Sequence, residues 1–205
     1  MDGDEAPLIK INNYCNQNGF HLIVDEAHST GISGENNFSL CSGLGINPFA
    51  RLHTFGKAMG CHGAIWITSK TVRKYLINFC RTFIYTTALP NYSLAVILAS
   101  FRILQKEDKL RSVLEKRIEI FNDEIKNSNL SECFIKSNSP IQSLILPGNE
   151  KVLSGMKFLI KHGFNVKAIR KPTIKEGMER IRISLHIYNS DHEIKELIKC
   201  LTQII

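Results

Sequence analysis

The sequence lacks any long apolar run. Its longest unbroken apolar stretch has six residues, at positions 94–99, whereas a helix that crosses a bilayer needs about 20. The first residues, MDGDEAPLIK, are acidic and contain no apolar core of the secretory type. From these absences we expect neither a membrane span nor a secretory leader, and we expect a cytoplasmic protein.

Paired cysteines are missing as well. The six cysteines are scattered, and no two of them form a C-x-x-C pair. A chain of 205 residues can bury a core without disulfides, so reduced thiols are expected. Cysteines and histidines do not cluster twice at ligand spacing, which argues against a metal site. We expect His53, His62 and His186 to be core or surface groups.

Charge of one sign is not concentrated anywhere. The net charge is +7, from 26 basic and 19 acidic residues, without a dense basic run. Nucleic-acid binding is therefore disfavoured. Anionic small molecules, such as phosphates or acyl-CoA, account for a mild positive excess equally well.

What is present is an alternation of short apolar runs and helical periodicity. In the first part, strands are expected over residues 20–24, 52–55, 63–68 and 83–85, and helices over 6–18 and 69–80. Residues 90–126 predict one long helix, or two with a bend near 106–108. Beyond them, strands are expected over 141–146, 164–169 and 180–185, and helices over 151–162 and 191–205.

This pattern predicts an α/β portion with parallel-type units, followed by a compact α+β unit. We expect the first domain to cover residues 1–105 and the second to cover residues 106–205, with the helical segment at about 90–126 joining them.

An acid and an imidazole follow the first predicted strand. Asp25 and His28 stand at D-x-x-H spacing just beyond it. Ligands of open α/β sheets bind beyond the carboxyl ends of the strands, so these side chains are candidates for holding one. The string DEAH also occurs in helicases, but no phosphate-binding loop stands among the 24 residues before Asp25. A helicase is therefore not expected.

A lysine among small residues follows another predicted strand. Lys57 lies between Gly56 and Gly60. Such a lysine can be merely solvated, or it can form a Schiff base with a flat cofactor that small neighbours allow to approach. Farther along, Thr86 and Thr87 precede a helix start, which by itself is only a capping pattern.

Taken together, these segments resemble a known family, the pyridoxal-phosphate-dependent α-oxoamine synthases. Several motifs in one order and spacing are far more specific than any single motif. The similar segments are MDGDEAPL, VDEAHSTG, TFGKAMGCHGA, IYTTALP, AIRKPTI and RIRISL, in that order. The resemblance implies part of the large domain of the aspartate aminotransferase-like type I fold, followed by a small α+β C-terminal domain.

The resemblance also implies roles for the motif residues. Lys57 resembles the lysine that binds pyridoxal phosphate covalently. Asp25 resembles the aspartate that keeps the pyridine nitrogen protonated, so that the ring accepts electrons. His28 resembles the histidine that hydrogen-bonds the phenolic oxygen of the ring, and Thr54 the threonine near the phosphate.

Other residues are implied to contact the phosphate or the substrate. Thr86 and Thr87 match hydroxyls that reach a phosphate across a dimer interface. Arg170 resembles the arginine that clamps the substrate carboxylate, a task that suits the guanidinium fork. Thr173 stands where the family has a second substrate contact. Arg182 lies in a motif strand, where a structural role is equally expected.

The GCHGA segment is similar to the branch of the family that serves biotin synthesis. That branch condenses L-alanine with pimeloyl-CoA or a pimeloyl carrier protein and releases carbon dioxide. The resemblance implies that Lys57 acts as the base that removes the α-proton in this reaction. Members that use glycine or serine remain alternatives.

The resemblance covers only the C-terminal half of the family's length. In the family, a glycine-rich phosphate turn and the side chain that stacks on the pyridine ring precede the MDGD motif. We therefore expect the chain alone to be a poor catalyst, the missing N-terminal half to be needed, and the full-length enzyme to be a homodimer. A non-catalytic fragment that pairs with a complementary chain is the other hypothesis.

Overall fold

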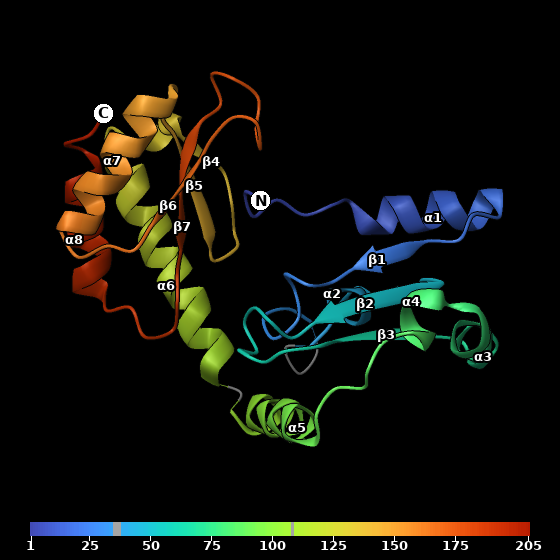
Figure 1. Ribbon diagram of the computed structural model, residues 1–205. Coiled ribbons are helices and arrows are strands. Elements are labelled where there is room, and N and C mark those ends of the chain that lie inside the picture. The colour runs from blue at the N-terminus through green and yellow to red at the C-terminus, as the bar shows by residue number, and fades with distance from the viewer. Residues whose placement is uncertain (35–37, 108) are drawn as a thin grey trace. The chain divides into compact units, whose positions relative to one another are not determined.

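The structure is a computed structural model that describes residues 1–34, 38–107 and 109–205 (Figure 1). The chain divides into two compact units. We call Ala6–Arg111 the lysine unit, and Met1–Glu5 together with Ser112–Ile205 the C-terminal unit. Within the described ranges, no helix combines the length and the apolar character that crossing a bilayer requires.

The lysine unit contains a three-stranded sheet in the order β1-β2-β3. Its strands are β1 (Ile23–Asp25), β2 (Ala50–Thr54) and β3 (Ala64–Thr68). β1 runs parallel to β2, whereas β2 and β3 are antiparallel. The loop between β2 and β3 is too short for the crossover that parallel strands require. The expected parallel arrangement is therefore found for β1 and β2 but not for β2 and β3, and the sheet is mixed.

The lysine unit also contains helices, and local signals mark their ends. They are α1 (Leu8–Asn18), α2 (Leu40–Gly43), α3 (Lys70–Phe79), α4 (Arg81–Ile84) and α5 (Asn91–Lys106). Gly19, with φ +68°, ends α1 in the left-handed conformation that glycine adopts easily. Ser69 begins α3, where its hydroxyl accepts the Val72 N–H at 3.2 Å.

The strand expected over residues 83–85 is wrong. This segment overlaps the short helix α4. The carbonyl of Cys80 accepts the N–H groups of Phe83 and Ile84, at 3.0 and 2.9 Å. These local bonds close a helical turn, so the apolar run does not extend into a strand.

The helical segment expected over residues 90–126 is divided in two. α5 ends at Lys106, and α6 (Lys109–Lys126) follows. The expected bend near residues 106–108 includes position 108, which lies outside the described residues.

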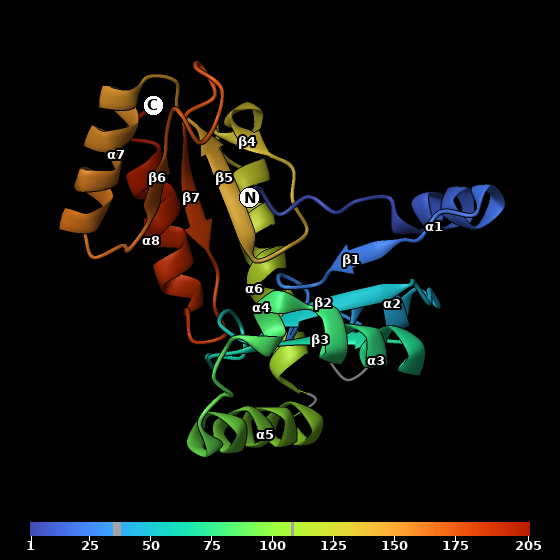
Figure 2. The same cartoon turned by 45° about the vertical axis from the view of Figure 1, so that its right-hand side comes forward.

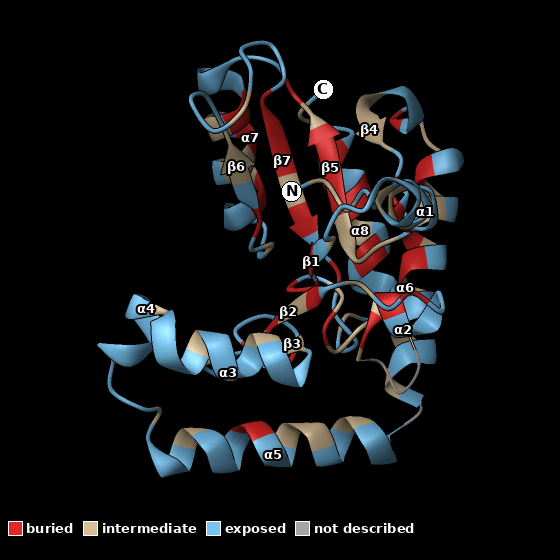
Figure 3. Ribbon diagram, turned by 90° about the vertical axis from the view of Figure 1, so that its right-hand side faces the viewer, coloured by how far each residue is buried: buried red, intermediate tan, exposed pale blue. Residues whose placement is uncertain are grey.

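Apolar packing in the lysine unit is divided between two small clusters. One gathers Leu8, Val24, Cys41 and Ile46, and the other gathers Phe55, Met59 and Ile97. Many large apolar side chains of this unit are exposed, including Phe79 at 65% and Tyr85 at 79%. Figure 3 shows α3 and α4 almost entirely in the colour of exposed residues. The unit therefore depends on polar contacts as well as on its small apolar clusters.

The C-terminal unit has a larger core. Its antiparallel sheet has the order β4-β5-β7-β6, and α6, α7 and α8 share one apolar cluster with it. Figures 1 and 2 show α7 and α8 beside one face of this sheet. The elements are η1 (Ser131–Cys133), β4 (Phe134–Ile135), β5 (Ile141–Ile145), α7 (Asn149–Lys161), β6 (Lys167–Ile169), β7 (Arg180–Ser184) and α8 (Asp191–Leu201).

Residues 1–5 lie on the opposite face of that sheet. The Asp2 carboxylate pairs with Arg180 Nη1 at 2.6 Å and accepts the Ser143 hydroxyl at 3.1 Å. Arg182 Nη1 lies 3.8 Å from the sulfur of Met1. Asp2 therefore supplies the counter-charge for the Arg180 side chain, which is only 7% exposed, and Arg182 has a structural contact.

We predict that Asp2→Asn destabilises the C-terminal unit by about 2 kcal/mol, because it leaves the buried Arg180 charge without its partner. Faster hydrogen exchange of the β7 amides would report the loss. Asp123→Asn is the matched control, since the Asp123–Lys126 pair has both side chains about 70% exposed. Equal protection in the two variants would contradict the prediction.

Candidate functional site

The candidate site lies where β1 and β2 end. Because these strands are parallel, their carboxyl ends meet at the same edge of the sheet. Asp25 is the last residue of β1 and pairs with Leu52, and Thr54 is the last residue of β2. Lys57 follows in the loop that leads to β3. The topology thus brings Asp25, Thr54 and Lys57 to one edge.

The loop that carries Lys57 is closed by backbone hydrogen bonds. The Phe55 N–H donates to Gly63 O at 2.9 Å, and the Cys61 N–H donates to Phe55 O at 2.7 Å. The Gly60 N–H donates to Lys57 O at 2.9 Å, with Gly60 at φ +62°. The backbone of Lys57 is therefore fixed, while its side chain is exposed.

The turn that carries Asp25 and His28 is also internally bonded. The Ala27 N–H donates to Asp25 Oδ1 at 2.8 Å. The Glu26 carbonyl accepts the N–H groups of Ser29 and Thr30, at 3.1 and 2.9 Å. Asp25 and His28 are exposed in this turn, whereas Glu26 is buried.

The two loops approach each other closely at Gly31. A Cβ atom on Gly31 would lie 3.2 Å from Ala58 Cβ and 3.4 Å from Met59 Cγ. Gly31 has φ +84°, which favours glycine in any case. The segment after β1 therefore packs directly on the residues that follow Lys57.

Beneath this edge lies a buried acid and imidazole that the sequence did not single out as a pair. Burial raises the pKa of Glu26, but hydrogen bonds from Ser39, Cys41 and Ser29 outweigh it and lower that pKa below its usual value. Burial lowers the pKa of His53 below its usual value, against the attraction of Glu26. His53 is a core group, as expected. The sequence does contain a signal for Glu26. Successive side chains of a strand point to opposite faces, so the residue after the exposed Asp25 is expected to point into the interior.

One hydroxyl at the edge lacks a partner. Thr54 Oγ1 is a buried atom without a hydrogen-bond partner in the part of the chain that the structure describes. A buried hydroxyl without a partner is costly, so this atom is a candidate for contact with a ligand.

Thiol and metal chemistry receive no support at this edge. All six cysteines are free. Burial, followed by the neighbouring Glu26 carboxylate, raises the pKa of Cys41 to about 12, which makes it a poor nucleophile. Within residues 1–34, 38–107 and 109–205, no group of three or more His, Cys, Asp or Glu side chains is placed to hold a metal ion.

The remaining candidates lie elsewhere. Thr86 and Thr87 are in the exposed segment between α4 and α5. Arg170 follows β6 in the C-terminal unit, and Thr173 lies in the loop after it; both are exposed. The sheet edge of the lysine unit thus accounts for Asp25, His28, Thr54 and Lys57, but not for these four.

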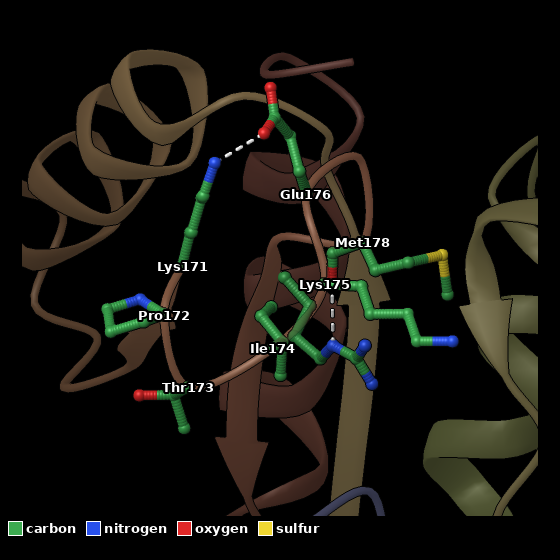
Figure 4. A pocket seen from close by; sticks show the side chains of 8 residues that line it. Lys171, Pro172, Thr173, Ile174, Lys175, Glu176 and Met178 are labelled. Carbon is green, nitrogen blue, oxygen red and sulfur yellow. Dashed lines mark hydrogen bonds and ion pairs between the residues drawn. The ribbon is translucent and has the colours of Figure 1, made fainter.

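The loop after Arg170 lines an open pocket of about 610 Å³. The lining combines three cations, Lys171, Lys175 and Arg180, with one acid, Glu176, and with Thr173 and apolar side chains. Lys171 Nζ pairs with Glu176 at 2.5 Å across the loop (Figure 4). Arg180 is also paired, with Asp2, so these ion pairs offset much of the positive charge of the lining.

The close approach at Gly31 yields a testable prediction. Gly31→Ala should destabilise the lysine unit by about 2 kcal/mol, from left-handed strain plus the contact with Ala58. Gly45→Ala is the control, because Gly45 has φ +66° with nothing within 4 Å and incurs the strain alone. Urea unfolding followed by fluorescence of Trp66, the single tryptophan, measures both variants. Equal losses would show that the two loops are not in tight contact.

Comparison with known proteins gives consistent matches. A sequence model of aminotransferase class I and II matches residues 1–201. The 8-amino-7-oxononanoate synthase of Serratia proteamaculans is 33% identical over 204 residues, covering 100% of this chain and 53% of its own length. The chain thus spans about half the length of the curated relatives it matches.

Solved structures agree on the fold. An 8-amino-7-oxononanoate synthase from Francisella tularensis has a TM-score of 0.86 and 28% identity, over 99% of this chain and 59% of that one. A serine palmitoyltransferase from S. paucimobilis, solved with a PLP–myriocin aldimine, has a TM-score of 0.90 and 22% identity, over 100% of this chain and 52% of that one. The α/β class expected from the sequence is confirmed.

The residues at the edge fit a cofactor such as pyridoxal phosphate. Lys57 offers an accessible amine, Asp25 an exposed carboxylate, and Thr54 a buried hydroxyl that needs a partner. An aldehyde, a protonated ring nitrogen and a phosphate oxygen are the groups that would satisfy them.

Proposed function

The chain belongs to the aminotransferase class I and II family, and from that membership we propose that it forms the lysine-bearing half of a pyridoxal-phosphate-dependent acyltransferase of the cytoplasm. The reaction is that of an 8-amino-7-oxononanoate synthase, in which L-alanine condenses with a pimeloyl thioester and carbon dioxide leaves. The observation that carries the proposal is the meeting of Asp25 and Lys57 at one sheet edge, in a chain aligned over its full length with such synthases.

Four residues of the lysine unit would hold the cofactor. Lys57 Nζ would bind its aldehyde carbon, and Asp25 would face the ring nitrogen and keep it protonated. His28 would hydrogen-bond the ring oxygen, and Thr54 Oγ1 would donate to the phosphate. When bound, the cofactor supplies an electron sink for negative charge at the α-carbon of the amino acid.

The chain's own groups would then orient the substrate and move its proton. Lys57 Nζ would take the α-proton of L-alanine as a general base. Arg170 would hold a substrate carboxylate through two parallel N–H donors, which a lysine could not supply. Thr173, which lines the open pocket after Arg170, would make the second contact.

The curated relatives favour alanine as the amino acid, since they are 8-amino-7-oxononanoate synthases at 33% identity. Serine palmitoyltransferase, glycine C-acetyltransferase and 5-aminolevulinate synthase are the alternatives within the same chemistry. The serine palmitoyltransferase structures support the fold alone, at 22% identity.

Catalysis is expected to need more than this chain. The relatives extend over about twice its length, and large apolar side chains of the lysine unit are exposed. We propose that a segment equivalent to the other half of the relatives, and a second copy whose Thr86 and Thr87 reach the phosphate, complete the site. A non-catalytic pairing module remains the second candidate, favoured by the same exposed apolar side chains.

The first test of the proposal is reductive trapping. Borohydride reduction of the chain with pyridoxal phosphate should place one adduct per chain on Lys57, located by mass spectrometry. Lys57→Ala should lower the yield at least about tenfold, because only this amine is held at the strand ends. Lys70→Ala, at the start of α3, is the control and should label fully. Adducts scattered over surface lysines would sink the proposal.

The choice of amino acid is tested by competition. L-alanine added before reduction should protect Lys57 from labelling at a concentration several-fold lower than glycine or L-serine requires, because a site for alanine fits its methyl group, which glycine lacks and L-serine extends with a hydroxyl. If glycine or L-serine protects better, the chain belongs instead with the members that use those amino acids.

A further inference from the structure

Glu26 stands between the exposed groups of the site and the interior. It is 2% exposed, although its neighbour Asp25 is exposed. A buried carboxylate is costly unless its oxygens are hydrogen-bonded. Its contacts therefore identify what this acid does.

The carboxylate gathers donors from two separate segments. Ser39 Oγ donates to Oε1 at 2.9 Å. Ser29 Oγ lies 3.0 Å from Oε2, and the Cys41 N–H donates to Oε2 at 3.4 Å. Ser29 belongs to the turn itself, whereas Ser39 and Cys41 belong to the start of α2. The side chain thus ties the turn to a helix that comes later in the chain.

The direction of the bond from Ser39 is fixed by its other partners. Ser39 Oγ accepts the Ser42 N–H and Arg51 Nη1, each at 3.1 Å. Its own proton must therefore go to an acceptor, which is Glu26 Oε1. Through this hydroxyl the Arg51 guanidinium approaches the carboxylate and partly offsets its charge.

The backbone of Glu26 binds the same turn to β2. The Glu26 N–H donates to Leu52 O at 2.7 Å, and the Thr30 hydroxyl donates to Glu26 O at 2.6 Å. Thr30 Oγ1 also lies 2.9 Å from His53 Nδ1. His53 stacks on Phe38 with ring centroids 4.7 Å apart. One residue is thus held by β2 on its backbone side and by α2 on its side-chain side.

We propose that Glu26 is a positioning residue, whose buried carboxylate fixes the turn that presents Asp25 and His28 to the cofactor. It touches neither cofactor nor substrate and acts through those two neighbours. This inference rests on the proposed function, since it assigns Glu26 to the same pyridoxal phosphate site.

Glu26→Gln is the informative substitution because it keeps the size of the side chain but replaces one of the two acceptor oxygens by an NH₂ donor. An amide NH₂ in place of Oε1 would face Ser39 Oγ, which already accepts two N–H groups. An NH₂ in place of Oε2 would face the Cys41 N–H donor. In either orientation the new NH₂ group faces another hydrogen-bond donor. The turn that carries Asp25 and His28 should therefore be held less firmly.

The test measures cofactor binding and not turnover. The pyridoxal phosphate concentration that half-saturates reductive labelling of Lys57 should rise about tenfold in Glu26→Gln, under conditions where Trp66 fluorescence shows a folded lysine unit. Glu179→Gln is the matched control. Glu179 is also 2% exposed but accepts the Gly148 N–H in the C-terminal unit, so its variant should label like the parent chain.

A double-mutant cycle separates positioning from general stabilisation. If Glu26 acts through Asp25, then Glu26→Gln should add little to the labelling defect of Asp25→Asn. Full additivity of the two defects would overturn the proposal. So would unchanged half-saturation in Glu26→Gln.

A cofactor-free readout keeps this inference separate from the proposed function. Hydrogen exchange of the Ser29 and Thr30 amides, which donate to Glu26 O, should accelerate at least about tenfold in Glu26→Gln and not in Glu179→Gln. Scattered labelling in the parent chain would defeat the proposed function. Unchanged exchange in the turn would defeat the positioning role, whatever the labelling shows.

Discussion

The parallel pairing of β1 with β2 is the constraint on which the rest of the candidate site depends. It places Asp25 beside Leu52, so that both strands end at the same edge. β3 is antiparallel to β2 and lies next to it, so the loop that carries Lys57 begins and ends at that same edge. A shift of this register by one residue would exchange the exposed Asp25 with the buried Glu26.

The two units are stabilised in different ways. The C-terminal unit has one continuous apolar cluster, to which three helices and the sheet contribute. The lysine unit has two small clusters and a buried polar layer around Glu26 and His53. The Glu26 carboxylate is satisfied only where Ser29, Ser39 and Cys41 all lie within hydrogen-bond distance, and this requirement specifies the geometry of the turn. This requirement suits a region that must hold two polar side chains at set positions.

Much of this arrangement follows from local sequence, and the rest does not. The ends of apolar runs located Asp25 and Lys57, and periodicity located α7 and α8. The strand expected over residues 83–85 failed because an apolar run alone cannot distinguish a strand from a helical turn. The role of Ser39 beside Glu26, and the antiparallel direction of β3, depend on contacts between distant residues. No local pattern carries that information.

The attachment of residues 1–5 to the C-terminal unit sets an order for folding. The Asp2 side chain binds Ser143 and Arg180, yet all of α1 to α5 lies between them in the chain. Residues 1–5 are synthesised before Ser112–Ile205, so they have no binding partners while the lysine unit is being synthesised. Closing so long a loop costs entropy that local contacts do not repay. The contact surface for Asp2 exists only after β5 and β7 have paired, so residues 1–5 bind after that pair has formed.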